Sequence, residues 1–300
     1  MTSSQSPRTH TFEARDGRSL VGSLFEPDGS PRAALLVSSG TGIPRRFYAR
    51  FAAHAADRGF VALTYDYRGI GDSAPASLRT DDARYRDWGQ QDIPGAIAWL
   101  TRRYPDVPLY TVGHSTGGQQ LGLAPNVDRV QAAVFVAVST GYWGGMPLLY
   151  RILTLAIFRL YVPLTSRLCG YAPAKKIGWG EDLPTNVARE WGAWCQEPDY
   201  MAAFFDEEGR RSPPDGAPFG PTHFDRARFP IRGYYFPDDP ISTPDNVPPM
   251  LSLYDQAEIE TRWVDPSDLN VSEIGHLGFF RPDVGRPLWD EALDWLVQQG

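Results

Sequence analysis

Residues 113–117 read Gly-His-Ser-Thr-Gly, and a further glycine, Gly118, follows them. The apolar run 108–112 comes before, and residues 119–123 are typical of the start of a helix. A serine on a sharp turn between a strand and a helix needs a positive φ, which crowds the side chains two before and two or three after it. Small residues stand at each of those places. The pattern predicts a nucleophile elbow in which Ser115 attacks the substrate; the alternative is a glycine-rich turn that contains serine by chance.

A serine hydroxyl is a weak nucleophile at neutral pH and needs a base within hydrogen-bond reach. The chain has five histidines: His10, His54, His114, His223 and His276. We predict that His276 is the base, because its loop connects the last expected strand to the last expected helix. In a doubly wound sheet such a loop emerges at the same carboxyl edge as the elbow. His114 is expected to pack beneath the elbow, and His223 is the weaker alternative.

The base needs an acid that orients its ring, and two candidates follow the apolar run 231–236. Asp238 and Asp239 stand there between two prolines. Serine, aspartate, histidine is the chain order that accompanies an elbow of this kind. We predict that Asp239, which directly precedes proline, is the acid and keep Asp238 as the alternative. The other interpretation of this segment is a simple turn.

Acyl transfer also requires hydrogen-bond donors for the oxyanion that develops on the substrate. The backbone N–H of Thr116, immediately after the nucleophile, is one predicted donor. The second should come from the loop 38–42, which follows the first expected buried strand. Thr41 is the preferred donor in that loop, and Gly40 is the alternative.

The elements around these residues alternate on a period of about thirty residues, which indicates a parallel sheet. Predicted strands are 10–15, 20–27, 33–38, 60–65, 109–112, 130–138, 231–236 and 259–264, and predicted helices are 48–58, 87–104, 245–256 and 288–298. The alternation stops at residue 139. Residues 140–228 are irregular and rich in Gly, Pro, Trp and Tyr, with helices expected near 146–162 and 186–196. We therefore predict a core of residues 1–139 and 229–300 with an inserted helical cap, residues 140–228.

Composition excludes several classes of function. The chain has 300 residues, a net charge of −7 and a pI near 5.3, so it offers no basic surface for nucleic acid. Two cysteines, Cys169 and Cys195, are too few for a disulfide framework, and a cytoplasmic location is expected. The first ten residues are polar and do not resemble a secretory leader. No cluster of ligand types has metal spacing, so neither a metal nor another cofactor is predicted.

The longest apolar stretch, residues 146–165, contains Arg151, Arg159 and Pro163. Charged residues and a proline argue against stable insertion into a membrane. We predict a mostly buried helix, with contact to a lipid surface as the alternative.

With these motifs, the chain resembles the α/β-hydrolase superfamily over nearly its whole length. It is most similar to lid-bearing bacterial serine hydrolases of the monoacylglycerol-lipase-like and serine-aminopeptidase-like type. Residues 65–73, Tyr-Asp-Tyr-Arg-Gly-Ile-Gly-Asp-Ser, are similar to the D-x-R-G-x-G-x-S loop of those enzymes, and Asp66 and Arg68 are expected to be structural. One departure is Ser39-Gly40, where many relatives have His-Gly. The resemblance implies a mostly parallel, doubly wound sheet with an inserted cap and a serine triad.

The leading hypothesis is a serine hydrolase that cleaves a carboxylic ester of a medium-sized apolar acyl or aryl substrate. The predicted cap is rich in aromatic residues, and a pocket roofed by them favours apolar groups. An acyltransferase, a thioesterase or a peptidase would use the same triad, and a non-catalytic ligand-binding homologue is the alternative from another class. The expected partner is a small acyl substrate, and by analogy with the fold a homodimer is conceivable.

Overall fold

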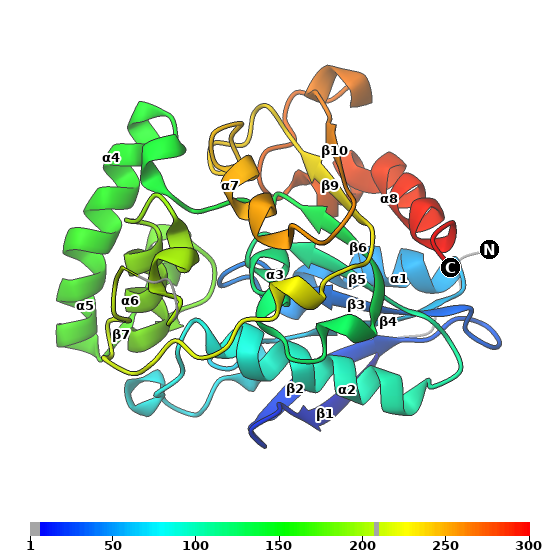
Figure 1. The fold of residues 1–300 in the computed structure, drawn as a ribbon, viewed down its shortest axis with the longest axis horizontal. Helices are drawn as coiled ribbons and strands as arrows, with labels where there is room; N and C mark the ends of the chain where they lie inside the picture. Colours follow the sequence, from blue (N-terminus) through cyan, green and yellow to red (C-terminus); the bar gives the residue numbers. More distant parts are fainter. Residues whose placement is uncertain (1–6, 207–209) are drawn as a thin grey trace.

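A single sheet of eight strands carries the chain's predicted site residues. The computed structural model describes residues 7–206 and 210–300. The strand order is β1-β2-β4-β3-β5-β6-β9-β10 (Figure 1). The strands are β1 (Arg8–Glu13), β2 (Ser19–Phe25), β3 (Ala33–Ser38), β4 (Phe60–Tyr65), β5 (Leu109–His114), β6 (Val130–Val136), β9 (Ile231–Tyr235) and β10 (Ile259–Trp263). β2 is antiparallel to both β1 and β4, and the remaining pairs are parallel.

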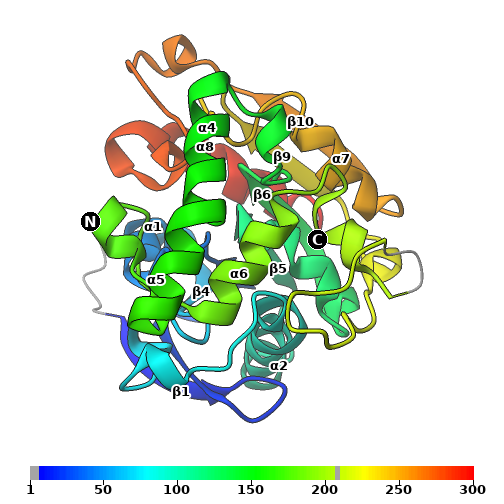
Figure 2. The same ribbon diagram turned by 90° about the vertical axis from the view of Figure 1, so that its left-hand side faces the viewer.

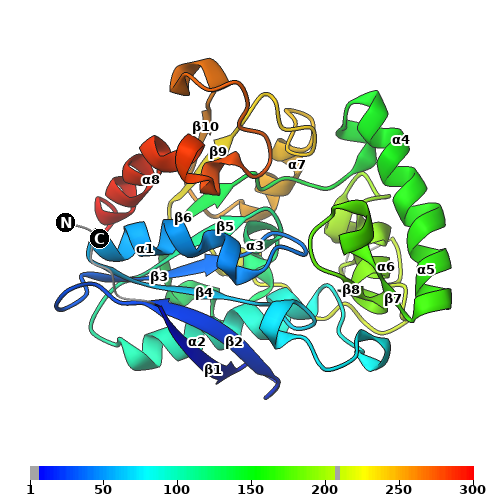
Figure 3. The same ribbon diagram turned by 180° about the vertical axis from the view of Figure 1, so that it is seen from behind.

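Helices cover both faces of this sheet, which explains why its central strands are continuous apolar runs. Every residue of β3, β4 and β5 is buried. α1 (Ala49–Asp57) and α8 (Pro282–Val297) pack against each other on one face, and α2 (Ile93–Arg103) covers the other, as Figure 3 shows from behind. Two buried apolar clusters follow, one on each face of the sheet. The short helices α3 (Thr116–Gln119) and α7 (Val247–Leu251) lie at the carboxyl side of the strands.

The predicted core strands and helices are confirmed, with shifts at their ends. β6 stops at Val136, two residues earlier than predicted: Ala137 still donates its N–H to Tyr234 of β9 at 3.0 Å, but its positive φ of 53° turns the chain out of the extended conformation. α8 begins at Pro282 rather than at residue 288. Proline is well tolerated at the first helical position, since its missing N–H would be unpaired there in any case.

The segment predicted as a cap, residues 140–228 and called the cap below, contains a long helix that faces outward. α4 (Leu148–Ala156), a π-helical turn (Ile157–Tyr161) and α5 (Val162–Cys169) run as one helix, called the cap helix below (Figure 2). It continues seven residues beyond the predicted end at 162, because Pro163 falls in the first turn of α5 and does not break it. The cap also contains α6 (Thr185–Trp194), the short pair β7 (Tyr171–Ala172) and β8 (Leu183–Pro184), and several 3-10 turns.

The prediction that the stretch 146–165 forms a mostly buried helix is wrong. In the described part of the chain, the cap helix is the one helix long and apolar enough to cross a membrane, and 22% of its apolar window is buried. Its outward side chains are between 59% and 73% exposed and are Leu148, Leu149, Ile152, Leu160, Leu164 and Leu168. The apolar composition of this stretch did not reveal that one side of the helix is left uncovered.

Candidate active site

The predicted elbow is present at the end of β5. Ser115 has φ 49° and ψ −115°, and α3 starts at the next residue. A Cβ on Gly113 would lie 2.6 Å from the backbone N of Gly118, and a Cβ on Gly117 would overlap the carbonyl group of Ser38. The strained turn therefore exists only because glycines stand on both sides of the serine.

Asp239 and His276 are brought together from separate loops. Asp239 follows β9 and is 3% exposed, and its Oδ2 lies 2.7 Å from Nδ1 of His276. Its Oδ1 accepts hydrogen bonds from the N–H groups of Ile241, at 2.8 Å, and Ser242, at 3.2 Å. Burial would raise the pKa of Asp239, but its charge interaction with His276 and these hydrogen bonds keep that pKa below its ordinary value.

The neighbouring carboxylate has a different task. Asp238 is exposed, and its Oδ2 accepts hydrogen bonds from the backbone N–H groups of Ile274, at 2.8 Å, and Gly275, at 3.0 Å. Asp238 thus holds the loop that carries His276, whereas Asp239 contacts the imidazole itself. Of the two predicted alternatives, the geometry favours Asp239 as the residue that orients the ring.

Beneath the elbow, His114 connects the histidine loop to the loop after β3. His114 is fully buried, and its Nε2–H donates to the carbonyl oxygen of His276 at 2.9 Å. Its Nδ1 therefore accepts from the hydroxyl of Tyr48 at 2.7 Å, and the same hydroxyl oxygen accepts from the N–H of Gly40 at 2.8 Å. Burial, reinforced by the nearby His276, lowers the pKa of His114 to about 3, so this ring stays neutral.

These contacts separate the two candidate donors of the loop 38–42. The N–H of Gly40 is used by Tyr48. Within residues 7–206 and 210–300, the backbone N–H groups of Thr41 and Thr116 have no hydrogen-bond partner. Of the two candidates in the loop 38–42, Thr41 is therefore the one whose N–H group is free for a ligand oxygen, as is that of Thr116 after the serine.

The two tyrosines at the site carried no recognisable signal in the sequence. Tyr48 lies at the start of the first predicted helix, and Tyr85 lies in the segment before α2. The hydroxyl of Tyr85 is 2.6 Å from Oγ1 of Thr41 and also hydrogen-bonds Oγ1 of Thr116. Neither tyrosine belongs to a motif, and both act across long sequence separations.

A cavity of about 240 Å³ lies between this set of residues and the cap. Ser115, His276 and Thr41 line it from the core. From the cap it is lined by Met146, Tyr150, Thr154, Phe158, Trp179, Trp191 and Cys195. Burial raises the pKa of the Cys195 thiol, so this second nucleophile is not a thiolate near neutral pH.

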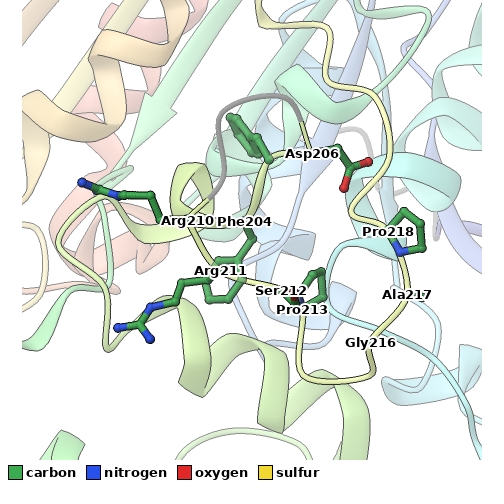
Figure 4. A pocket seen from close by; sticks show the side chains of 10 residues that line it. Phe204, Asp206, Arg210, Arg211, Ser212, Pro213, Gly216, Ala217 and Pro218 are labelled. Atoms are coloured by element: carbon green, nitrogen blue, oxygen red, sulfur yellow. The ribbon is translucent and has the colours of Figure 1, made fainter.

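A larger hollow of about 470 Å³ lies elsewhere, at residues 204–206 and 210–218 (Figure 4). Its polar side chains form hydrogen bonds and an ion pair that hold the surrounding loop. The carboxylate of Asp206 accepts the N–H groups of Phe219 and Gly220, and Arg211 pairs with Glu197 at 3.1 Å. We therefore assign the candidate active site to the smaller cavity, where the strained serine and the histidine meet.

The loop at residues 65–73 supports the site without facing it. Asp66 accepts the backbone N–H groups of Arg45, at 2.7 Å, and Asp72, at 3.0 Å. Arg68 pairs with Asp92 at 2.6 Å and with Asp16 at 2.8 Å. Among the described residues, no group of three or more His, Cys, Asp or Glu side chains is arranged to hold a metal ion.

Comparison with known proteins assigns the chain to a family. A profile described as serine aminopeptidase, S33, matches residues 29–180, which include Ser115 but neither Asp239 nor His276. The chain belongs to this family. Mouse monoglyceride lipase is 28% identical over 103 residues, which are 34% of this chain and 33% of the mouse protein. The chain thus matches about a third of the length of these curated relatives.

Solved structures show the same α/β-hydrolase fold over nearly the whole chain. A soluble variant of monoglyceride lipase from Saccharomyces cerevisiae, solved with a substrate analogue, has a TM-score of 0.60 at 14% identity and covers 100% of this chain and 97% of its own. A lipase in its open form has a TM-score of 0.63 at 14% identity, with 98% and 99% covered. At these identities the likeness concerns the fold.

Proposed function

We propose that this S33-family α/β hydrolase is a serine hydrolase that cleaves a carboxylic ester of a medium-sized apolar acyl or aryl substrate. The observation that carries the proposal is the cavity shared by Ser115 and His276, with Asp239 bonded to the far nitrogen of the imidazole. Ser115 is held in a strained backbone conformation at the carboxyl end of β5, where a nucleophile is expected.

The reaction follows from these positions. Oγ of Ser115 attacks the ester carbonyl while Nε2 of His276 takes the hydroxyl proton, and Asp239 stabilises the imidazolium without accepting that proton. The N–H groups of Thr41 and Thr116 donate to the oxyanion. His276 then gives its proton to the departing alcohol, and water hydrolyses the acyl-enzyme by the same steps. The hydroxyl of Ser115 has no partner in the described part of the chain, which is common for catalytic hydrogen bonds before substrate binds.

The cavity supports an apolar substrate of limited size. Its cap side consists largely of aromatic and aliphatic side chains, among them Phe158, Trp179 and Trp191. Its volume of about 240 Å³ is below the usual range for small-molecule sites, roughly 300–1,000 Å³. We expect short to medium acyl chains to be cleaved faster than long ones.

The cap helix suggests how such a substrate arrives. Its inner side chains Tyr150, Thr154 and Phe158 line the cavity, while its outer side exposes leucines. Residues 141–180 contain no Asp or Glu, although the whole chain has a net charge of −7, and their cations are Arg151, Arg159, Arg167, Lys175 and Lys176. We infer peripheral contact with an anionic lipid surface, without stable insertion, because a spanning cap helix would leave the cavity.

The test is hydrolysis of p-nitrophenyl esters from acetate to laurate by the wild type, Ser115→Ala and His276→Ala. Chain-length-dependent turnover that is lost in both variants supports the proposal. Labelling by a fluorophosphonate probe at Ser115 without ester turnover would favour an acyltransferase, a thioesterase or a peptidase. Added acceptor alcohol separates transfer from hydrolysis, because an acyltransferase would form the new ester in preference to the acid. Absence of labelling in the folded protein would favour a non-catalytic homologue.

A further inference from the structure

The two predicted oxyanion donors are joined from behind by one buried hydroxyl. The hydroxyl oxygen of Tyr85 lies 2.6 Å from Oγ1 of Thr41 and hydrogen-bonds Oγ1 of Thr116. Tyr85 is fully buried and does not line the cavity. It therefore contacts the side chains of both predicted donor residues from outside the cavity.

The sheet does not determine the distance between these two donors. Pairing of β3 with β5 ends at Ser38 opposite Gly113. Thr41 lies three residues beyond that point, and Thr116 lies beyond it on the other side of the strained serine. Their N–H groups must nevertheless point at a single oxygen about 3 Å away from each. The hydroxyl of Tyr48 links Gly40 to His114, one step behind each donor, whereas the hydroxyl of Tyr85 bonds the two donor residues themselves.

Tyr85 is itself held firmly. Its ring centroid lies 5.1 Å from that of Trp88 and 4.8 Å from that of Trp194, which belongs to α6 of the cap. The next residue, Arg86, donates its backbone N–H to the carboxylate of Glu190 in α6 at 3.0 Å, and the two side chains form a buried ion pair. On the other side of the bridge, Nε2 of Gln120 donates to Oγ1 of Thr116 at 3.3 Å.

We propose that Tyr85 is a positioning residue for ester cleavage, whose hydroxyl sets the spacing of the Thr41 and Thr116 N–H donors. This inference rests on the proposed function. Because Tyr85 does not contact the cavity, its loss changes how well the transition state is held and leaves substrate binding almost unchanged. Misplaced catalytic donors lower turnover by up to about 100-fold.

The decisive variant is Tyr85→Phe, which keeps the ring and removes the bridge. Its matched control is Tyr67→Phe: the Tyr67 ring stacks on the same Trp88 at 4.7 Å, and its buried hydroxyl has no hydrogen-bond partner within the described residues. For each protein we would measure kcat and KM for a p-nitrophenyl ester per fluorophosphonate-labelled site. The inhibition constant of a trifluoromethyl ketone with the same acyl chain would also be measured, because its adduct places an oxyanion in the hole.

For Tyr85→Phe we expect kcat to fall by about 10- to 100-fold, KM to stay within about twofold, and the ketone to bind more weakly by the same factor as kcat/KM. Tyr67→Phe should match the wild type. An unchanged kcat per labelled site, or an unchanged ketone constant, would overturn the proposal. A purely structural role would lower the labelled fraction or the melting temperature without moving either constant.

Thr41→Val provides an independent test, since it removes the bridged hydroxyl and retains the N–H donor. If Tyr85 acts through this bridge, combining Thr41→Val with Tyr85→Phe lowers kcat no further than the stronger single change. Fully multiplicative losses would contradict the bridge even if Tyr85→Phe folds poorly. Failure of the wild type to label at Ser115 would instead remove the proposed function, and this outcome is separate from every result above.

Discussion

The sheet core, which carries Ser115, and the cap, which covers it, are held in place by different kinds of contact. In the core, glycines with no room for a Cβ and a continuous ladder of parallel strands place Ser115, Asp239 and His276 within narrow limits. In the described part of the cap, strand pairing is limited to two residues each of β7 and β8, and the outward leucines of the cap helix are exposed. The comparison indicates that chemistry is built on the rigid part and that the cap determines which substrates reach it.

The largest effect should come from the nucleophile in the core. Ser115→Ala is expected to reduce kcat by about 10⁴- to 10⁶-fold, because the covalent step is lost while the pocket remains. Steady-state kinetics with a p-nitrophenyl ester would measure this, with the melting temperature as a check on folding. Residual activity within tenfold of the wild type would mean that another group attacks the ester and that Ser115 is not the nucleophile.

Next in size is the difference between the adjacent carboxylates. Asp239→Asn should lower kcat by about 10⁴-fold, because the imidazole loses its correct tautomer, whereas Asp238→Asn should cost far less since it only loosens the histidine loop. Comparable losses in both variants would contradict the separate tasks seen in the structure.

From the environment of Asp239 we also predict how the free energy of unfolding depends on pH. The pKa of Asp239 is lower in the folded chain than its ordinary value of 3.8, so its contribution to stability is complete above that pH and is lost as pH falls through the folded-state pKa. Urea unfolding at pH 7 and pH 3 should show the wild type's advantage over Asp239→Asn shrinking at the lower pH. If the advantage of the wild type over Asp239→Asn grew as the pH fell, the pKa of Asp239 would be raised in the folded chain and not lowered.

Glycine substitutions test directly whether the core tolerates an added methyl group less well than the cap does. Gly117→Ala should destabilise the fold by about 3 kcal/mol, because the new methyl group overlaps the backbone of Ser38. Gly178→Ala in the cap has φ 75° and open space around it, so backbone strain of about 1 kcal/mol is the expected cost. Chemical denaturation measures both, and equal values would show that the cap is as tightly determined as the core.

The smallest effect on chemistry belongs to the outer side of the cap helix. Leu160→Ser with Leu164→Ser should leave turnover of a soluble ester within about twofold, yet weaken co-sedimentation with phosphatidylglycerol vesicles by about tenfold or more. Trp263→Ser, on the edge strand β10, is the control for an exposed apolar residue elsewhere. If the leucine changes convert a dimer to a monomer and vesicles are never bound, a second copy of the chain covers this side instead.

Features that depend on local chain chemistry could be predicted from the sequence. The elbow was recognisable because Gly113, Gly117 and Gly118 permit it, and the buried strands because their residues are predominantly apolar. The bridging tyrosines could not be predicted. Tyr85 contacts Thr116 across 31 residues, and Tyr48 contacts His114 across 66, so only the folded chain brings them together. The position before proline favoured Asp239 over Asp238, but the sequence did not predict that Asp238 would accept the backbone N–H groups of the histidine loop.

The buried pair of Arg86 and Glu190 bears on how the cap can be exchanged in protein engineering. The two side chains are 2% and 3% exposed, one on the core side and one in α6 of the cap. Removing one partner from such a pair leaves a buried charge uncompensated, at a cost of about 3–5 kcal/mol. Asp215, also in the cap, pairs with Arg86 at 3.0 Å, so a chimera that receives residues 140–228 from another hydrolase must bring carboxylates to positions 190 and 215 or lose the arginine at position 86. The cap is consequently not a free module, and a library of grafted caps should be built around this charge from the start.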